Sequence, residues 1–382
     1  MSAPLRVLTI GHSYVVALNQ RVPAAIANDS RIDLTLAAPR FHYGDLRRLH
    51  LEKASDPHYR IVPLTARWTR KNHIFWYEHR ALRRLIREGE FDVVHAWEEP
   101  YSYAGYEIAR AVAPSGARFM FRTAQSIVKQ YPWPFSHFER FTLARADGWV
   151  AGGGLVYEAM KDKGFPCAHG RVITLGVDMD VFRPLDRKSR RTVLDELRVD
   201  PPVVGFIGRL VEAKGLDILM AAMERVKPPW SLLILGSGPY ESNITRWATA
   251  RGWSDRVRIL LVPHDDVPRY LGAMDLMLAP SQTTPSWKEQ FGRMIIEAFA
   301  CGVPVIGSDS GEIPYVIAEA GVVVPEADVG EWVRQTETLL SDERRRHALG
   351  GKGLQRCREH YDVGQVAEKY IEFYHELCGA GA

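Results

Sequence analysis

The sequence is poor in cysteine and has no long apolar run. No uninterrupted apolar stretch approaches the ~18 residues that a membrane-spanning helix needs. The N-terminus passes directly into LRVLTIG, a short strand pattern, so no signal peptide is expected. The cysteines lack the paired or CxxC spacing of a disulfide framework or a zinc site; they are Cys167, Cys301, Cys357 and Cys378. A reducing compartment, the cytoplasm, is therefore expected.

The chain also has little net charge, +3 over 382 residues, which gives no indication of a nucleic-acid partner. The charge is uneven, however. Residues 1–182 carry 24 Lys and Arg against 18 Asp and Glu, whereas the remainder carries 25 against 28. Within residues 40–87 the counts are 12 against 4, which predicts a basic surface on the first half of the chain.

Short apolar runs alternate with helix-length amphipathic segments almost throughout, a pattern typical of βαβ units and parallel sheets. The expected strands are 6–11, 32–38, 61–64, 91–96, 118–123, 148–151 and 172–175, then 203–207, 232–235, 257–262, 276–279, 303–307 and 322–324. The length suits two domains, and the turn-rich segment 176–202 marks their boundary. We therefore expect an α/β fold of two doubly wound, Rossmann-like domains, 1–182 and 183–362, facing a central cleft.

The stretch 289–306, EQFGRMIIEAFACGVPVI, predicts a helix from Arg293 to Ala300 followed by a buried strand. The main-chain N–H groups of Phe291, Gly292 and Arg293 open this helix, and a helix N-terminus with a glycine beside it binds anions. This pattern predicts a diphosphate at the start of the helix.

Glu289 and Glu297 lie eight residues apart, so both can lie near one end and one face of that helix. We expect Glu289 on the sugar side of the diphosphate and Glu297 on its ribose side. The alternative is two solvent-facing glutamates on an ordinary helix.

The stretch 203–222, VVGFIGRLVEAKGLDILMAA, predicts a buried strand that ends at Gly208 and a helix that begins near Gly215. Arg209 and Lys214 lie in the turn between them. Two cations at the carboxyl end of a strand suit a diphosphate leaving group and could neutralise its developing charge without a metal ion. A pair of surface cations on a loop is the alternative reading.

A Gly-x-Gly-Pro turn follows the strand at 232–235. Its first glycine, Gly236, permits close approach of the backbone to a ligand, although a tight turn alone explains the glycine equally well.

Together, FG…EAFACGxPV around the two glutamates and GRL-x3-KG-x-D at 208–217 resemble the signatures of the retaining glycosyltransferases of family 4, which have the GT-B fold. The resemblance implies that Glu289 contacts the donor sugar, Glu297 the nucleotide ribose, and Arg209 with Lys214 the diphosphate. It also implies that a phosphate oxygen takes the acceptor's proton as the hydroxyl attacks the face from which the diphosphate leaves.

The same resemblance implies two further features. The backbone at Val262, Pro263 and His264 would face the nucleotide base, although His264 by itself reads as a loop histidine. A terminal helix at 363–378 would pack back on the first domain.

In the first domain, Gly11 and His12 follow the first strand, where donor and acceptor could approach. An ordinary loop histidine is equally compatible with the pattern. Gln125 stands where most members of the resembled family have a histidine near the reacting sugar. A glutamine can hydrogen-bond a sugar hydroxyl but cannot titrate, so Gln125 is a candidate for orienting the donor.

The strand at 91–96 ends in polar and aromatic residues that would face the crevice. His95 is one acceptor-side candidate, Trp97 could stack on a sugar, and Glu98 or Glu99 could orient acceptor hydroxyls. The alternative is a partly buried histidine followed by a solvated acidic turn.

The segment 67–87 interleaves arginines with aromatic and aliphatic residues. Such a helix could lie on an anionic membrane surface. The alternative is a helix that packs on the sheet and presents a solvated basic face.

We therefore expect a retaining hexosyltransferase that moves a sugar from a nucleoside-diphosphate sugar to a carbohydrate, lipid-linked or small-molecule acceptor. It would need no cofactor and no metal ion, and would be cytoplasmic or peripheral on the inner face of the membrane. Two alternatives remain: an inactive sugar-nucleotide-binding module, and a GT-B phosphorylase or epimerase.

Overall fold

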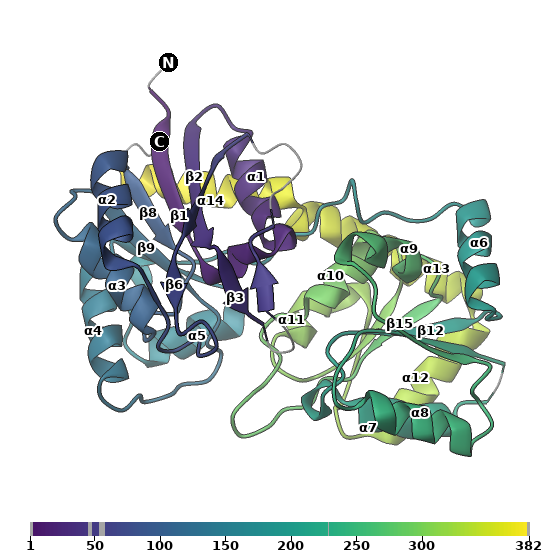
Figure 1. Cartoon of the computed structure of the whole chain (residues 1–382). Coiled ribbons are helices and arrows are strands. Elements are labelled where there is room, and N and C mark those ends of the chain that lie inside the picture. Colours follow the sequence, from purple (N-terminus) through teal and green to yellow (C-terminus); the bar gives the residue numbers. More distant parts are fainter. Residues whose placement is uncertain (1–2, 45–47, 53–57, 228, 380–382) are drawn as a thin grey trace. The chain divides into compact units, whose positions relative to one another are not determined.

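The computed structural model describes residues 3–44, 48–52, 58–227 and 229–379 (Figure 1). The chain forms two compact units. Unit 1 comprises Met1–Gly176 and Val363–Ala382, and unit 2 comprises Val177–Asp362.

The division between the units lies before the 182/183 position expected from the sequence. The main-chain N–H of Val177 donates to the Tyr361 carbonyl at 2.8 Å, and Val177 forms an isolated parallel bridge with Asp362. The Phe182 ring is buried beside His264, with ring centroids 5.5 Å apart. These contacts place residues 177–182 in unit 2.

Unit 1 contains a seven-stranded parallel sheet in the order β11-β10-β9-β8-β1-β2-β5. Its strands are β1 Leu5–Ile10, β2 Ile32–Pro39, β5 Arg60–Leu64, β8 Val93–Ala96, β9 Arg118–Thr123, β10 Gly148–Ala151 and β11 Gly170–Val172. Its helices are η1 His12–Val15, η2 Ala17–Gln20, α1 Arg21–Ala27, α2 His79–Gly89, α3 Tyr103–Val112, α4 Phe135–Arg145, α5 Gly154–Asp162, η3 Cys167–His169 and α14 Val363–Leu377.

Unit 2 contains a six-stranded parallel sheet in the order β14-β13-β12-β15-β16-β17. Its strands are β12 Val203–Ile207, β13 Ser231–Leu235, β14 Val257–Leu260, β15 Leu276–Ala279, β16 Val305–Ser308 and β17 Val322–Val324. Its helices are α6 Arg187–Leu197, η4 Glu212–Lys214, α7 Leu216–Arg225, α8 Glu241–Ala250, η5 His264–Asp266, α9 Val267–Leu271, α10 Arg293–Ala300, α11 Ile313–Ile317, η6 Ala318–Ala320, α12 Val329–Ser341, α13 Glu343–Arg356 and the π-helical η7 Cys357–Tyr361.

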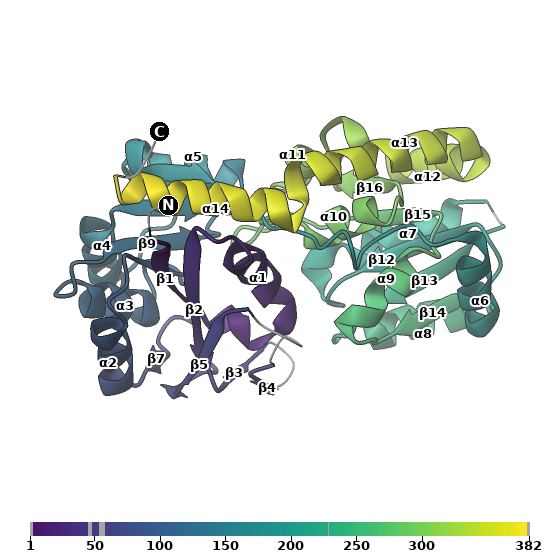
Figure 2. The ribbon, with the colours of Figure 1, turned by 90° about the horizontal axis from the view of Figure 1, so that it is seen from above.

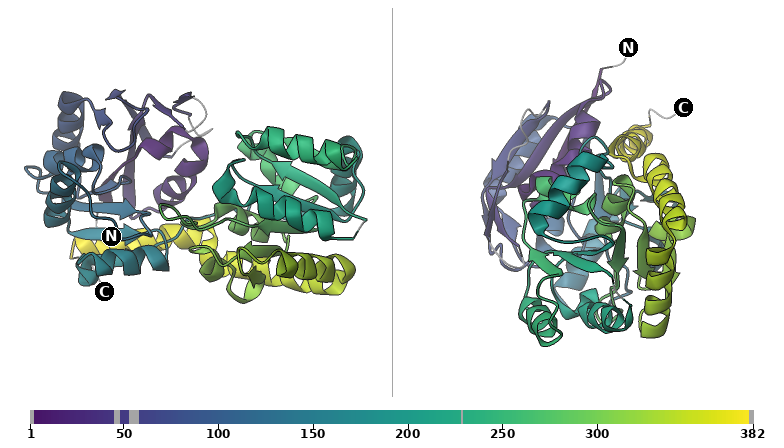
Figure 3. Two further views of the ribbon diagram at one scale, coloured as in Figure 1. Left: turned by 90° about the horizontal axis from the view of Figure 1, so that it is seen from below. Right: turned by 90° about the vertical axis from the view of Figure 1, so that its right-hand side faces the viewer.

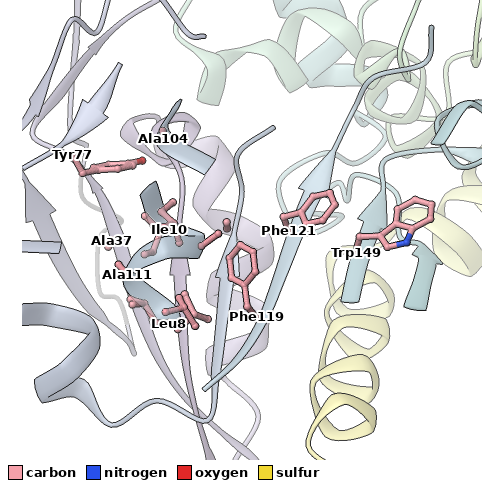
Figure 4. Packing of buried hydrophobic residues seen from close by; sticks show 14 of the residues in the cluster. Leu8, Ile10, Ala37, Tyr77, Ala104, Ala111, Phe119, Phe121 and Trp149 are labelled. Carbon is pink, nitrogen blue, oxygen red and sulfur yellow. The ribbon is translucent and has the colours of Figure 1, made fainter. Parts of the chain in front are cut away.

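The α/β class with two doubly wound sheets is confirmed, because every pairing within the two large sheets is parallel. Successive residues of β1 alternate between two buried layers. Leu8 and Ile10 pack with α2 and α3 in one core, as Figure 4 shows beside Phe119, Phe121 and Trp149, whereas Val7 packs with α1 and α14 in the other. Burial on both faces explains why the strands read as continuous apolar runs.

Helix α14 belongs to unit 1, although unit 2 precedes it in the chain. Figure 2 shows α14 running beside α1, and the two are in contact. Its buried side chains join the core of unit 1; they are Val366, Ala367, Tyr370, Ile371, Phe373 and Tyr374. Both ends of the chain therefore lie in unit 1, as the labels in Figure 3 show.

The segment 67–87 is not one continuous helix. Residues 66–67 and 76–77 form the antiparallel hairpin β6–β7, and the helix α2 begins only at His79. Phe75, Tyr77 and Leu82 are fully buried, so much of the apolar part of the segment lies in the core and not on the surface. The hairpins β3–β4 (Phe41–Tyr43 and Arg48–His50) and β6–β7 (Ala66–Arg67 and Trp76–Tyr77) were not predicted.

Within the part of the chain that the structure describes, no helix combines the length and the apolar character needed to cross a membrane.

Candidate functional site

Each large sheet has one point where its strand order reverses. In unit 2 this point lies between β12 and β15, and in unit 1 it lies between β1 and β8. In open α/β sheets, ligands bind beside the carboxyl ends of the strands at such a point, because the connections leave the two neighbouring strands in opposite directions. A ligand site is therefore expected in the loops that follow these four strands.

In unit 2, the loops after β12 and β15 bring Lys214 and Ser281 to the same carboxylate, that of Glu289. The Lys214 Nζ lies 2.5 Å from Glu289 Oε2, and the Ser281 hydroxyl donates to the same oxygen at 2.8 Å. All three side chains are largely or fully buried. The Lys214 Nζ also lies 5.2 Å from the centroid of the Trp287 ring. The sequence predicted roles for Lys214 and Glu289 separately, but it did not predict their ion pair.

Glycines allow these loops to pack closely. A Cβ on Gly215 would lie 1.7 Å from the Pro280 carbonyl oxygen, and its φ of +72° is left-handed. A Cβ on Gly236 would lie 1.9 Å from the Gly208 carbonyl oxygen. The loops at 208–215, 236–238 and 280–281 thus form one packed group at the edge of the sheet. Arg209 lies on its exposed surface.

Helix α10 begins and ends at the predicted residues, Arg293 and Ala300. Gly292 precedes it in the left-handed region with a φ of +84°, and the Phe291 ring is buried against Tyr361 with centroids 5.8 Å apart. This packing holds the start of the helix in one position.

Glu297 is only 4% exposed, and its Oε1 lies 3.7 Å from Nε2 of His264. Glu289 is 7% exposed. The alternative reading of two solvent-facing glutamates is therefore wrong. His264 follows the half-buried Val262 and the exposed Pro263. His264 and Glu297 thus bring together the two stretches to which the family resemblance assigns the base and the ribose.

In unit 1, His12 and Glu98 follow β1 and β8 and form a close pair. The His12 Nδ1 lies 2.7 Å from Glu98 Oε2, and the His12 main-chain N–H donates to Oε1 at 2.7 Å. The Tyr77 hydroxyl donates to the same Oε1 at 2.9 Å. Gly11 stands just before His12, and a Cβ there would lie 2.8 Å from Trp97 Cβ. Glu98 is 3% exposed, so the solvated acidic turn considered above is wrong for this residue.

Glu99 and Gln125 hold the loop after β9. The Thr123 hydroxyl and the Ala124 N–H donate to the Glu99 carboxylate at 2.7 and 2.8 Å, and burial raises the pKa of Glu99 despite these hydrogen bonds. The Gln125 amide donates to the Tyr131 hydroxyl at 2.7 Å. Gln125 is half-buried, and it has no titratable proton to contribute.

His95 is buried in the core of unit 1, whereas Trp97 is only half-buried. His95 is 1% exposed, its Nδ1 lies 3.0 Å from the Tyr374 hydroxyl, and burial lowers its pKa to about 3. The Trp97 ring is half-buried, with the Arg122 guanidinium 4.6 Å from its centroid. His95 is thus a core residue, because its strand is covered by α14, and Arg122 covers part of the ring that was expected to stack on a sugar.

Sequence reasoning missed His42, Tyr77 and the role of Ser281 at Glu289. His42 and Tyr77 come from the hairpins β3–β4 and β6–β7, whose short strands carry no periodic signal. Ser281 lies in the loop after β15, and no local pattern marks it as a partner of Glu289. Among residues 3–44, 48–52, 58–227 and 229–379, no group of three or more His, Cys, Asp and Glu side chains is placed to hold a metal ion.

Sequence models of two families match the chain: Glycosyltransferase Family 4 over residues 29–181 and Glycosyl transferases group 1 over residues 193–356. Together they cover most of the chain. A D-inositol 3-phosphate glycosyltransferase of Segniliparus rotundus is 35% identical over 195 residues, which is 48% of this chain and 42% of that protein. The chain thus spans about two fifths of the length of this curated relative.

Solved structures of similar fold cover nearly the whole chain. Anabaena HepE in complex with UDP has a TM-score of 0.76 and 17% identity, over 97% of this chain and 100% of that chain. A glycosyltransferase from Rickettsia africae has a TM-score of 0.80 and 16% identity, over 98% of this chain and 99% of that chain. At sequence identities of 16–17%, this structural similarity shows the fold alone.

Proposed function

Since the chain belongs to the GT-B glycosyltransferases of family 4, we propose that it transfers a sugar from a nucleoside-diphosphate sugar to a hydroxyl group of an acceptor. The observation that carries the proposal is the buried cluster of Lys214, Glu289 and Ser281 at the switch point of unit 2. Two of its members, Lys214 and Glu289, are the residues to which the family resemblance assigns contacts with the diphosphate and with the donor sugar.

The chemistry of this cluster suits a donor with a diphosphate. The Lys214 ammonium has three N–H donors, and one faces Glu289, so two can bind phosphate oxygens. Among the described residues, the Lys214 and Ser281 side chains both contact Glu289 through Oε2, so Oε1 could bind a hydroxyl of the donor sugar. Arg209 and the N–H groups at Phe291, Gly292 and Arg293 would complete the diphosphate site.

On this arrangement Glu297 would bind the nucleotide ribose, and the backbone at 262–264 would face the base. Uracil is the first base to test, because the similar Anabaena protein is solved with UDP. Gly208 and Gly236 would let the main chain approach the phosphates. Two cationic side chains with a helix N-terminus can balance the charge of the leaving group, so we expect transfer to proceed in EDTA. Loss of transfer in EDTA with rescue by Mn²⁺ would contradict this.

The direct test is a thermal-shift panel of UDP-, GDP- and ADP-sugars, followed by product analysis with and without acceptor. We expect one nucleotide class to raise the melting temperature and its sugar to be transferred. The family that the sequence resembles retains the anomeric configuration of the donor sugar. NMR of the product tests whether this protein does so. Binding without turnover would support the inactive binding module, and phosphorolysis or epimerisation of the donor would support the other alternative.

Membrane association stays a prediction. The exposed arginines of α2, Arg80, Arg83, Arg84 and Arg87, form a basic surface, while Leu82 and Ile86 face the core. Any attraction to an anionic membrane would thus be mainly electrostatic and would weaken with salt. Co-sedimentation with anionic vesicles at low and high salt tests it, and no binding at low salt would contradict it.

A further inference from the structure

A pocket of about 330 Å³ lies between α2 and α3, two helices of unit 1 that contact each other and lie side by side in Figures 1 and 2. Its polar lining consists of three arginines, two tyrosines, one histidine and one glutamate. This volume is at the lower end of the range for small-molecule sites, ~300–1,000 Å³. The pocket lies wholly within unit 1, and none of the residues assigned above to donor or acceptor lines it.

The three arginines of the pocket have no anionic partner among the described residues. Arg80 and Arg83 lie three positions apart near the start of α2, hence on one face, and Arg110 comes from α3. All three are exposed, and no described residue forms an ion pair or a side-chain hydrogen bond with them. On the same helix α2, by contrast, Arg87 pairs with Glu88 at 3.5 Å. The pocket therefore carries three guanidinium groups that are available to a ligand.

Glu107, the glutamate of the pocket, is buried and does not cancel this charge near neutral pH. Its Oε2 accepts the main-chain N–H of Tyr77 at 3.0 Å, and its Oε1 lies against Nδ1 of His79. Burial raises the pKa of Glu107 to about 8, although the Tyr77 hydrogen bond and the charges of Arg83 and Arg110 lower it. Below pH 8 the carboxyl is therefore mainly protonated. The titratable and charged groups that face it come from α2 and α3: His79, Arg83, Tyr103 and Arg110.

Two tyrosine rings line the pocket beside the arginines. Tyr103 and Tyr106 are half-buried, with ring centroids 6.1 Å apart, and Tyr103 also packs edge-on against Trp76 at 6.3 Å. The Arg110 guanidinium lies 5.6 Å from the centroid of the Tyr106 ring. These contacts hold the rings and restrain Arg110 before a ligand binds, which lowers the entropy cost of binding. The rings also offer an apolar surface to the carbon skeleton of a ligand.

We propose that this pocket binds a phosphomonoester group, carried either by a soluble metabolite or by a lipid headgroup. Guanidinium groups match the geometry of phosphate oxygens and bind them through paired N–H donors. A phosphomonoester carries a charge of about −1.5 to −2 at pH 7, which three arginines can balance, whereas a carboxylate carries only one charge. The inference is independent of the proposed function, because it involves no transfer step.

The first measurement is calorimetric titration of the full chain with glycerol 3-phosphate at pH ~7 and ~0.15 M salt. The wild type is expected to bind. Arg83→Gln and Arg110→Gln, which change one helix each, should each weaken binding ~10-fold or more, because each removes a charge-assisted contact. The matched control is Arg84→Gln, which removes the same charge from an exposed neighbour on α2 that does not line the pocket. This control should leave the affinity nearly unchanged.

The pH dependence of binding gives a second readout, which a purely structural role of these residues would not change. Above pH 8 Glu107 ionises and places a negative charge beside the phosphate, so binding by the wild type should weaken between pH ~7 and ~9. Glu107→Gln cannot ionise, so its affinity should stay nearly constant over this range. A decline of equal size in Glu107→Gln would contradict a phosphate bound beside this carboxyl.

Co-sedimentation with vesicles distinguishes the two sources of the phosphate. The vesicles contain phosphatidylcholine with either phosphatidic acid, a phosphomonoester, or phosphatidylglycerol, a phosphodiester, at matched surface charge. A preference for phosphatidic acid that Arg83→Gln loses and Arg84→Gln keeps assigns a lipid headgroup to the pocket. Binding of glycerol 3-phosphate without such a preference assigns a soluble ligand.

The inference is overturned if the wild type neither binds glycerol 3-phosphate nor prefers phosphatidic acid to phosphatidylglycerol. It is also overturned if Arg83→Gln and Arg84→Gln weaken binding equally, because that result would indicate a delocalised basic surface. Loss of glycerol 3-phosphate binding in Lys214→Ala but not in Arg83→Gln would place the anion in the diphosphate site of unit 2 and would overturn the inference as well.

Discussion

At the scale of single residues, the carboxylates of the candidate site residues Glu98, Glu289 and Glu297 are buried. Burying a carboxylate is costly unless a cation or hydrogen-bond donors accompany it. Glu98 lies against His12 and Tyr77. Glu289 lies against Lys214 and Ser281, and Glu297 lies against His264. These partners hold each carboxylate in one place, which is what a site that binds hydroxyl groups requires.

The first prediction separates the two glutamates of unit 2. Glu289→Gln should lower kcat by ~10–10³-fold, because a contact with the sugar strengthens as the ring develops positive charge. Glu297→Gln should mainly raise the donor KM, because a ribose contact is the same in the ground and transition states. Both constants are measured with saturating acceptor. The control is Glu212→Gln, an exposed residue of the turn that contains Lys214.

The reverse pattern, with kcat lost in Glu297→Gln and KM raised in Glu289→Gln, would show that the nucleotide lies the other way along α10. Normal values of kcat and donor KM in both variants would mean that the donor does not contact this helix.

A second prediction at this scale concerns stability and pH. Burial holds the pKa of His95 at about 3, below its usual 6.5. Below pH 6.5 the unfolded chain binds a proton at His95 and the folded chain does not. Stability should therefore fall with decreasing pH from 6.5 towards 3, by up to ~1.4 kcal/mol per pH unit for this residue.

His95→Gln keeps a partner for the Tyr374 hydroxyl but cannot titrate. Its free energy of unfolding should depend less steeply on pH than that of the wild type between pH ~5 and ~6.5, the range above most carboxylate titrations. Urea unfolding at several pH values measures the slope. An unchanged slope would mean that His95 gains a proton in the folded protein.

At the scale of elements, the site of unit 2 depends on how closely two loops approach each other. Gly215 and Gly252 both have a left-handed φ, of +72° and +68°. A Cβ on Gly215 would strike the Pro280 carbonyl, whereas a Cβ on Gly252 would meet nothing within 4 Å. Comparing alanine substitutions at these two positions therefore distinguishes the cost of a strained backbone from the cost of a clash between the loops.

Gly252→Ala should cost only the ~1–2 kcal/mol of a left-handed alanine. Gly215→Ala should cost more than this and should also weaken donor binding, because the loop that carries Lys214 must move away from Ser281. Urea unfolding and UDP binding are measured for both variants. Equal costs with unchanged UDP binding in Gly215→Ala would show that the loops do not need this approach.

At the scale of the whole molecule, unit 2 is continuous in sequence, but unit 1 is assembled from two ends of the chain. Helix α14 contributes six buried side chains to unit 1, and each large apolar side chain is worth ~1.5–3 kcal/mol when buried. Their summed contribution is comparable with the free energy of unfolding of a typical domain, ~5–15 kcal/mol.

A fragment of residues 177–362 should therefore melt cooperatively, whereas residues 1–176 alone should bind a hydrophobic dye and show no sharp transition. Joining residues 363–382 to 1–176 through a flexible linker should restore a cooperative melt. Circular dichroism and dye fluorescence distinguish these states. A sharp melt of 1–176 alone would mean that α14 is dispensable for the fold of unit 1.

The sequence by itself determined the parallel sheets, the strands β9, β10, β12, β15 and β17, and the bounds of α10. These features follow from patterns within a few residues: continuous apolar runs for strands buried on both faces, and a glycine before a helix-period segment. The family motifs indicated Lys214, Glu289 and Glu297 as candidate site residues, but they did not indicate which of these residues contact each other.

Only the tertiary structure decided which of these residues meet. Lys214 and Glu289 are 75 positions apart, His12 and Glu98 are 86 apart, and His95 and Tyr374 are 279 apart. Such pairs depend on which strands are neighbours and where their loops emerge, and no local pattern contains that information. The same reason explains the missed hairpins, the late start of α2 and the burial of His95, since each depends on packing against distant segments.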